Sequence, residues 1–125
     1  SWVPSEQNAL KIIIDGSMND DLATEGWGFI VRDSQGHALG AGAGYMLHVQ
    51  DPLHAEAITC LESLQAAQAR GISEVHVETD ASQLVQALWS DDQDMTINDV
   101  IFKEIKYFTR LNFNFFRITF CPKSM

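Results

Sequence analysis

The sequence predicts an α/β protein of mixed α+β character, in which helices flank a mixed β-sheet. Apolar residues alternate with a period of two over residues 10–15 and Thr24–Arg32, a pattern typical of strands. A polar turn at residues 33–36 joins two strands as a hairpin, and after Asp51 the apolar period lengthens to that of a helix. The resulting order, β-β-β-α-β-α-α-β, indicates an antiparallel hairpin followed by strands with crossover helices.

Three strands are expected in the N-terminal half, at residues 10–15, Thr24–Arg32 and 37–48. The first alternates Leu10, Ile12 and Ile14 onto one face, and Ile13 makes its other face apolar too. A strand that is apolar on both faces belongs in the centre of a sheet, and Gly16 is expected to end it. The glycine-rich run at residues 40–44 lacks the helix and lysine of a phosphate loop, so we expect strand bulging or close packing there.

Helices dominate the C-terminal half. Asp51 and Pro52 suit the N-cap and first turn of a helix that stops at Arg70 and Gly71. Beyond it, the periods predict a strand at 72–79, a helix at 81–89, a helix at 97–110 and a strand at 112–121.

Length and composition indicate one globular domain, residues 1–125. Hydrophobic residues make up 46% and the formal net charge is −9, which argues against a basic protein that grips nucleic acid by charge alone. Cys60 and Cys121 sit among apolar neighbours and are expected to be two reduced, buried thiols. That usage favours an intracellular protein of the nucleus or cytoplasm, and no apolar run approaches the length of a membrane span.

Three acidic residues fall at the edges of predicted elements. Asp15 closes the first strand, Glu56 lies early in the first helix, and Asp80 closes the fourth strand. Taken singly, they are explained by a turn, a favourable helix N-terminus and a helix cap. A fold in which the first and fourth strands are neighbours would bring them together, and Mg²⁺ would then offset their mutual repulsion.

Four motifs resemble a known family along nearly the whole chain. Lys11-Ile-Ile-Ile-Asp-Gly-Ser, Gly26-Trp-Gly-Phe-Ile-Val-Arg-Asp-Ser-Gln-Gly, His54-Ala-Glu-Ala and Val77-Glu-Thr-Asp-Ala-Ser are similar to successive segments of ribonuclease H domains. The sequence most resembles plant ribonuclease H-like domains derived from retrotransposon reverse transcriptases, where an arm like Trp2-Val-Pro and a tail like Cys121-Pro-Lys-Ser also occur.

The resemblance implies a fold, a reaction and a site. The fold would be ribonuclease H-like, a five-stranded mixed sheet in the order 3-2-1-4-5 flanked by helices. The reaction would be metal-dependent hydrolysis of the RNA strand of RNA–DNA hybrids. Asp15, Glu56 and Asp80 would be catalytic residues and ligands of Mg²⁺ or Mn²⁺, and hybrid recognition would use backbone shape and the 2′-hydroxyl.

The resemblance also shows departures. The family's fourth carboxylate lies on a helix after the last strand, whereas this sequence stops at Met125, so we expect a truncated last helix and an incomplete two-metal site. The basic residues near the C-terminus form a modest cluster, namely Lys103, Lys106, Arg110, Arg117 and Lys123. The alternative function is a catalytically inactive ribonuclease H-like module that binds another protein.

Overall fold

The computed structural model describes residues 10–19, 24–47, 52–90 and 99–122, and it gives the backbone alone for 15–19, 24–27, 43–47 and 99. The predicted N-terminal arm around Trp2, the predicted N-cap Asp51 and the acidic stretch 91–94 lie outside the described residues. Lys123 of the predicted basic cluster also lies outside them.

Eight elements follow one another in the predicted order. They are β1 (Leu10–Asn19), β2 (Thr24–Arg32), β3 (Ala38–Leu47), α1 (Pro52–Ala69), β4 (Glu74–Thr79), α2 (Ser82–Trp89), α3 (Asp99–Asn112) and β5 (Phe115–Phe120). The strands form one sheet in the order β3-β2-β1-β4-β5. β2 pairs antiparallel with β1 and β3, and β4 pairs parallel with β1 and β5. The predicted mixed sheet and its strand order are therefore confirmed.

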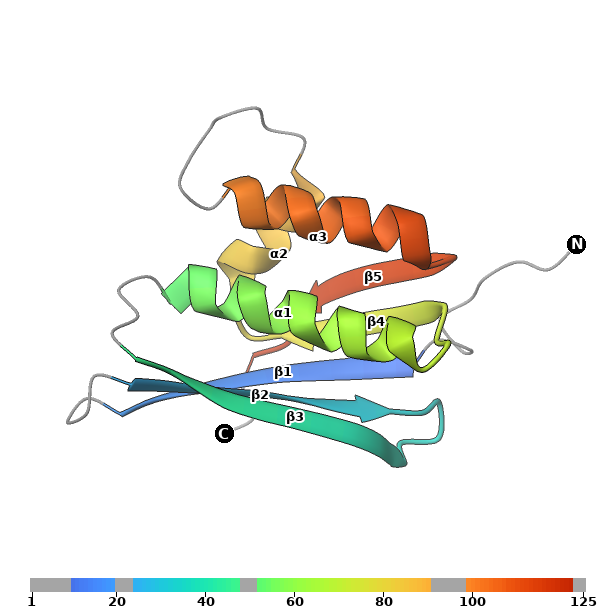
Figure 1. Ribbon diagram of the computed structural model, residues 1–125, viewed down its shortest axis with the longest axis horizontal. Helices are drawn as coiled ribbons and strands as arrows, with labels where there is room; N and C mark the ends of the chain where they lie inside the picture. Colours follow the sequence, from blue (N-terminus) through green and yellow to red (C-terminus); the bar gives the residue numbers. More distant parts are fainter. Residues whose placement is uncertain (1–9, 20–23, 48–51, 91–98, 123–125) are drawn as a thin grey trace, which may run out of the picture.

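The hydrophobic core lies between the sheet and the helices. Figure 1 shows α1 and α3 running over the same face of the sheet, with the central strand β1 beneath α1. Ile12 and Ile14 of β1 are buried toward this layer, while Lys11 and Ile13 are only half-buried, as the period of a strand requires. The other main contributors to the core are Val75, Val77, Cys60, Leu64, Leu84, Ile105 and Ile118.

The turn between β2 and β3 is built on Asp33. Its carboxylate accepts hydrogen bonds from the backbone N–H groups of His37 and Gln35, each at 2.9 Å. The bond from the His37 backbone is the largest of the effects that hold the pKa of Asp33 below its ordinary value. Gly36 takes a positive φ of 90° in this turn, a conformation that favours glycine.

The glycine-rich run belongs to β3 and allows close packing, as predicted. A Cβ on Gly42 would lie 2.6 Å from a ring carbon of Phe29, and one on Gly40 would lie 2.1 Å from a guanidinium nitrogen of Arg70. Arg70 also donates a hydrogen bond to the carbonyl of Leu39 at 3.2 Å. The small residues therefore let the side chains of Phe29, on β2, and of Arg70, which follows α1, lie close to β3.

Two predicted boundaries were wrong. β1 does not end at Gly16 but continues to Asn19, because the antiparallel ladder with β2 extends to the pair Asn19–Thr24. Asn112 does not begin the last strand but ends α3, where its side-chain amide donates to the carbonyl of Phe108 at 3.0 Å.

The prediction of two buried thiols was half wrong. Both cysteines are free and Cys60 is buried in α1, but Cys121 is exposed. Cys121 follows the end of the edge strand β5, where its backbone N–H still donates to the carbonyl of Thr79 but no layer covers its side chain. Among the described residues, no helix has the length and apolar character needed to cross a membrane.

Candidate active site

The parallel pairing of β1 with β4 brings two of the predicted acids to neighbouring positions. Ile14 of β1 is opposite Thr79 of β4. Asp15 and Asp80 each follow that pair by one residue, so their backbones occupy equivalent positions after Ile14 on β1 and Thr79 on β4. Adjacent strands lie about 4.8 Å apart, and the first and fourth strands are neighbours, as the sequence argument required.

Glu56 reaches the same place from α1. Its side chain is buried, with 6% of its surface exposed, and its carboxylate accepts a hydrogen bond from the hydroxyl of Thr79. Thr79 directly precedes Asp80 and is opposite Ile14, so the contact fixes Glu56 beside both strand positions. The fold therefore brings the backbones of Asp15 and Asp80 close to the Glu56–Thr79 contact, although the three acids are far apart in the chain.

The ordinary roles suggested for these acids do not hold. Asp15 does not begin a turn, because β1 continues through it. Asp80 is not the cap of α2, because Ala81 occupies the N-cap position. Glu56 lies past the first turn of α1, which contains no acidic residue. The turn suggested at Asp15 and the cap suggested at Asp80 are thus not found at those positions.

Thr79 is a residue of the candidate site that the sequence did not single out. Besides donating to Glu56, its hydroxyl accepts a hydrogen bond from the backbone N–H of Ala81 at 3.1 Å. It thereby connects α1 to the β4–α2 junction that carries Asp80. Its position in the strand could have indicated this role. Val75, Val77 and Thr79 alternate inward, so the Thr79 hydroxyl lies at a core position, where a buried polar group needs a hydrogen-bond partner.

The sequence from residue 14 to residue 125 matches the family described as Reverse transcriptase-like. The chain belongs to this family. The match includes Asp15, Glu56 and Asp80 and spans nearly the whole chain. No curated protein matches the sequence significantly.

Solved structures share the fold of this reverse transcriptase-like domain at low sequence identity. Ribonuclease H1 of Halobacterium salinarum superposes with a TM-score of 0.72 and 17% identity, covering 92% of this chain and 86% of that one. LC11 ribonuclease H1, in complex with an RNA/DNA hybrid, superposes with a TM-score of 0.78 and 18% identity, covering 91% of this chain and 86% of that one. The N-terminal ribonuclease H domain of a Mycobacterium tuberculosis protein has a TM-score of 0.74 and 16% identity, covering 92% of this chain and 84% of that one. The fold is thus that of ribonuclease H.

The donor atoms of the reverse transcriptase-like domain at this edge suit a hard divalent cation. Glu56 and Asp80 offer only oxygen ligands, which Mg²⁺ prefers, and the Glu56 carboxylate is withdrawn from bulk water. Among the side chains that the structure describes, no three His, Cys, Asp or Glu are grouped so that they could hold a metal ion. Only the backbone of Asp15 is described, and its role as a third ligand stays a prediction from the sequence.

Cys60 lies one helical turn from Glu56 but is unsuited to nucleophilic chemistry. Burial and, to a smaller extent, the nearby Glu56 carboxylate raise the pKa of its thiol to about 12. A thiol with that pKa stays protonated at neutral pH. Cys60 is therefore not a candidate nucleophile.

The predicted basic cluster is divided between two surfaces. Lys103, Lys106 and Arg110 lie on α3 at intervals that place them on one side of the helix. Arg117 alternates with the buried Ile118 of β5, and its side chain therefore lies on the opposite face of the sheet from the helices.

Proposed function

We propose that this domain is a metal-dependent ribonuclease H that hydrolyses the RNA strand of RNA–DNA hybrids. The observation that carries the proposal is that Asp15 and Asp80 directly follow the Ile14–Thr79 pair, while Glu56 accepts a hydrogen bond from Thr79. The fold shared with LC11 ribonuclease H1, whose structure contains an RNA/DNA hybrid, supports the substrate class.

The three carboxylates would hold Mg²⁺ or Mn²⁺. Bound there, the metal would supply an activated water and stabilise the leaving oxygen of a phosphodiester. Glu56 would bind from the protein side, since its carboxylate is buried and oriented by the Thr79 hydroxyl. Asp80 is half-buried and would bind from the side open to solvent, where the substrate phosphate must approach.

A cleavage assay on a labelled RNA–DNA hybrid tests the proposal. Cleavage is expected to need Mg²⁺ or Mn²⁺, to leave a 3′-hydroxyl and a 5′-phosphate, and to be lost in Asp80→Asn. Asp33→Asn is the matched control, because it removes the same charge from the β2–β3 turn. Equal cleavage by wild type and Asp80→Asn would overturn the proposal.

A metal titration followed by NMR gives a second readout that does not depend on turnover. Amide signals of Glu56, Thr79 and Asp80 are expected to shift at millimolar Mg²⁺ or Mn²⁺, and less so in Asp15→Asn. Without metal, Asp15→Asn is expected to raise the melting temperature or leave it unchanged, since it relieves repulsion between acids. A fall of several degrees in EDTA would assign Asp15 a structural role instead.

The second candidate is an inactive module that binds another protein. Val100, Tyr107 and Leu111 recur on one side of α3 and are 62–66% exposed, an apolar surface typical of a contact site. A chain that lacks metal-dependent cleavage and binds a different protein, with the binding abolished by Leu111→Glu, would favour this function.

The origin and location of the protein stay predictions of the sequence. The family match supports descent from a reverse transcriptase, and we infer a retrotransposon-derived domain of a plant protein, acting in the nucleus or cytoplasm.

A further inference from the structure

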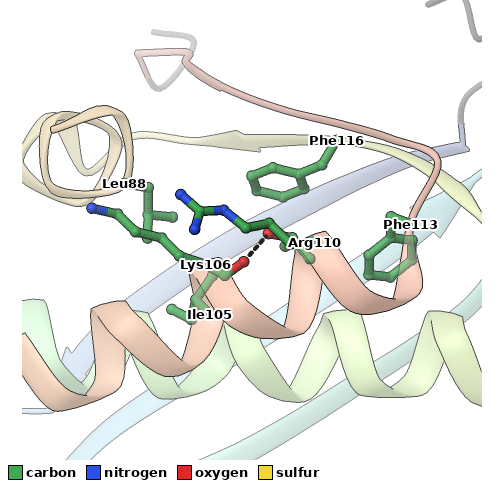
Figure 2. Close-up of a pocket in the computed structure, with 7 residues that line it drawn as sticks. Leu88, Ile105, Lys106, Arg110, Phe113 and Phe116 are labelled. Atoms are coloured by element: carbon green, nitrogen blue, oxygen red, sulfur yellow. Dashed lines mark hydrogen bonds between the residues drawn. The ribbon is translucent and has the colours of Figure 1, made fainter. Parts of the chain in front are cut away.

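A pocket of about 320 Å³ lies between α2, α3 and β5, away from the acidic site. Figure 2 shows its lining, with Leu88 contributed by α2, Lys106 and Arg110 by α3, and Phe116 by β5. Phe116 is opposite Val75, four residues before Thr79 on β4. Four residues of strand span about 13 Å, so the pocket and the acids beside Thr79 are separate sites.

The inner wall of the pocket is apolar. Ile105 is fully buried, Phe113 is 9% exposed, and Leu88 and Phe116 are half-buried. The hydroxyl of Thr109, the polar group among them, donates to the carbonyl of Lys106 at 2.8 Å and is not directed to a ligand. Such a wall suits a hydrocarbon or aromatic body and offers no hydrogen bonds with which to read a sugar or a base.

The rim of the pocket is cationic. Lys106 and Arg110 are four residues apart on α3, and Figure 2 shows their side chains extending over the pocket in the same direction. Lys106 donates one hydrogen bond to the carbonyl of Ser90, the C-cap of α2, which leaves two of its three donor positions. Arg110 is exposed, and no described residue forms a hydrogen bond or an ion pair with it.

This concentration of positive charge contrasts with the net charge of the whole chain, which is −9. The ion pairs found among the described residues, Lys11 with Glu78 and His37 with Asp33, lie elsewhere. α2, which forms one wall, contains no charged residue. No acidic residue is among the described residues that line the pocket beside the two cations.

We propose that this pocket binds an amphipathic anion, whose apolar body lies against Ile105, Phe113 and Phe116 and whose carboxylate contacts Arg110 and Lys106. A single compact negative group fits the two adjacent cationic heads, and the pocket volume is within the range of small-molecule sites. The site is independent of the ribonuclease activity proposed above.

Three probes of one chain length separate the two parts of the recognition. Decanoate, decanol and decyltrimethylammonium, each below its micelle concentration, are titrated into the protein and followed by amide NMR shifts and calorimetry. Decanoate is expected to shift signals of Leu88, Arg110 and Phe116. Decanol should bind at least about tenfold more weakly, because it lacks the charge-assisted hydrogen bonds, and decyltrimethylammonium should bind more weakly still.

Two variants test the placement of the anion. Arg110→Gln is expected to weaken decanoate binding about tenfold and to leave decanol unchanged. Lys103→Gln is the matched control, because it makes the same charge change on an exposed position of α3 that does not line the pocket. Arg110 is exposed, so neither variant should unfold the domain.

Four results would overturn the proposal. The first is equal affinity for decanoate and decanol, and the second is equal weakening of decanoate binding by Lys103→Gln and Arg110→Gln. The third is amide NMR shifts confined to other surfaces, and the fourth is displacement of decanoate from the pocket residues by an RNA–DNA hybrid. The last result would assign the cationic rim to nucleic acid instead. Cleavage assays in the presence of decanoate distinguish the pocket from the acidic site. Decanoate bound in the pocket should leave the dependence of cleavage on Asp80 unchanged.

Discussion

Replacing Thr79 by valine tests the contact that holds the acidic site together. Valine keeps the shape of the side chain but removes the hydroxyl that donates to Glu56 and accepts from the backbone of Ala81. Thr79 is 2% exposed and Glu56 is 6% exposed, so bulk water cannot easily replace the lost bond. The variant should therefore be less stable than the wild type, most of all with no metal present.

The expected loss follows from the chemistry of that bond. A hydrogen bond to a charged group contributes about 1.5–3 kcal/mol, and a buried group left without its partner costs a similar amount. We expect Thr79→Val to lower the free energy of unfolding by about 2 kcal/mol, partly offset by the added methyl group. For a domain of this length, that corresponds to a fall in Tm of about 8 °C.

Urea denaturation in EDTA, followed by circular dichroism, measures this loss. Thr59→Val is the matched control: Thr59 is equally buried, but its hydroxyl donates to a carbonyl within its own helix, that of Ala55. The control should cost less than about 1 kcal/mol. A double-mutant cycle with Glu56→Gln should give a coupling of about 1 kcal/mol or more. Equal effects of the two threonine variants, or no coupling to Glu56, would refute the proposed role of the hydroxyl.

Three further predictions concern packing, pH and thiol chemistry. Gly42→Ala should destabilise the fold by about 1–3 kcal/mol in urea, because the new Cβ meets the ring of Phe29; unchanged stability would show that the ring moves freely. The lowered pKa of Asp33 contributes stability that is present above pH 3.8 and is lost as the pH falls through the pKa of the folded state. Asp33→Asn and wild type should therefore differ more in Tm at neutral pH than well below pH 3.8. In native protein an alkylating agent should modify the exposed Cys121 and spare Cys60, as read by mass spectrometry; modification of Cys60 without unfolding would contradict its burial and its pKa of about 12.

The central place of β1 was predictable from a local pattern, because apolar residues occupy both faces of that strand. The strand order that makes β4 its neighbour came from the resemblance to ribonuclease H domains, and no local motif links the three acids. The end of β1 was not predictable, because residues 16–19 pair with β2 through backbone groups that need no apolar side chain. The exposure of Cys121 depends on its lying past an edge strand, which apolar neighbours in sequence do not reveal.

The details of the site lay further from what the sequence can show. Glu56 was expected near a helix N-terminus, but its burial and its partner Thr79 follow from how α1 crosses the sheet. The pocket is likewise formed by three elements, and the sequence showed Lys106 and Arg110 as part of a larger basic cluster, with no sign that apolar walls stood behind them.

The pairing of β1 with β4 has a consequence for how the domain folds. β1, β2 and β3 form a meander of near neighbours, whereas the ladder that joins Leu10 to Val75 closes a loop containing two strands and a helix. Closing a long loop costs entropy before its contacts form, so this ladder should assemble late. Asp15 and Asp80 directly follow the last pair of this ladder, one on each of its two strands. A metal ion bound there would therefore stabilise the fully folded domain over any intermediate that contains the meander alone.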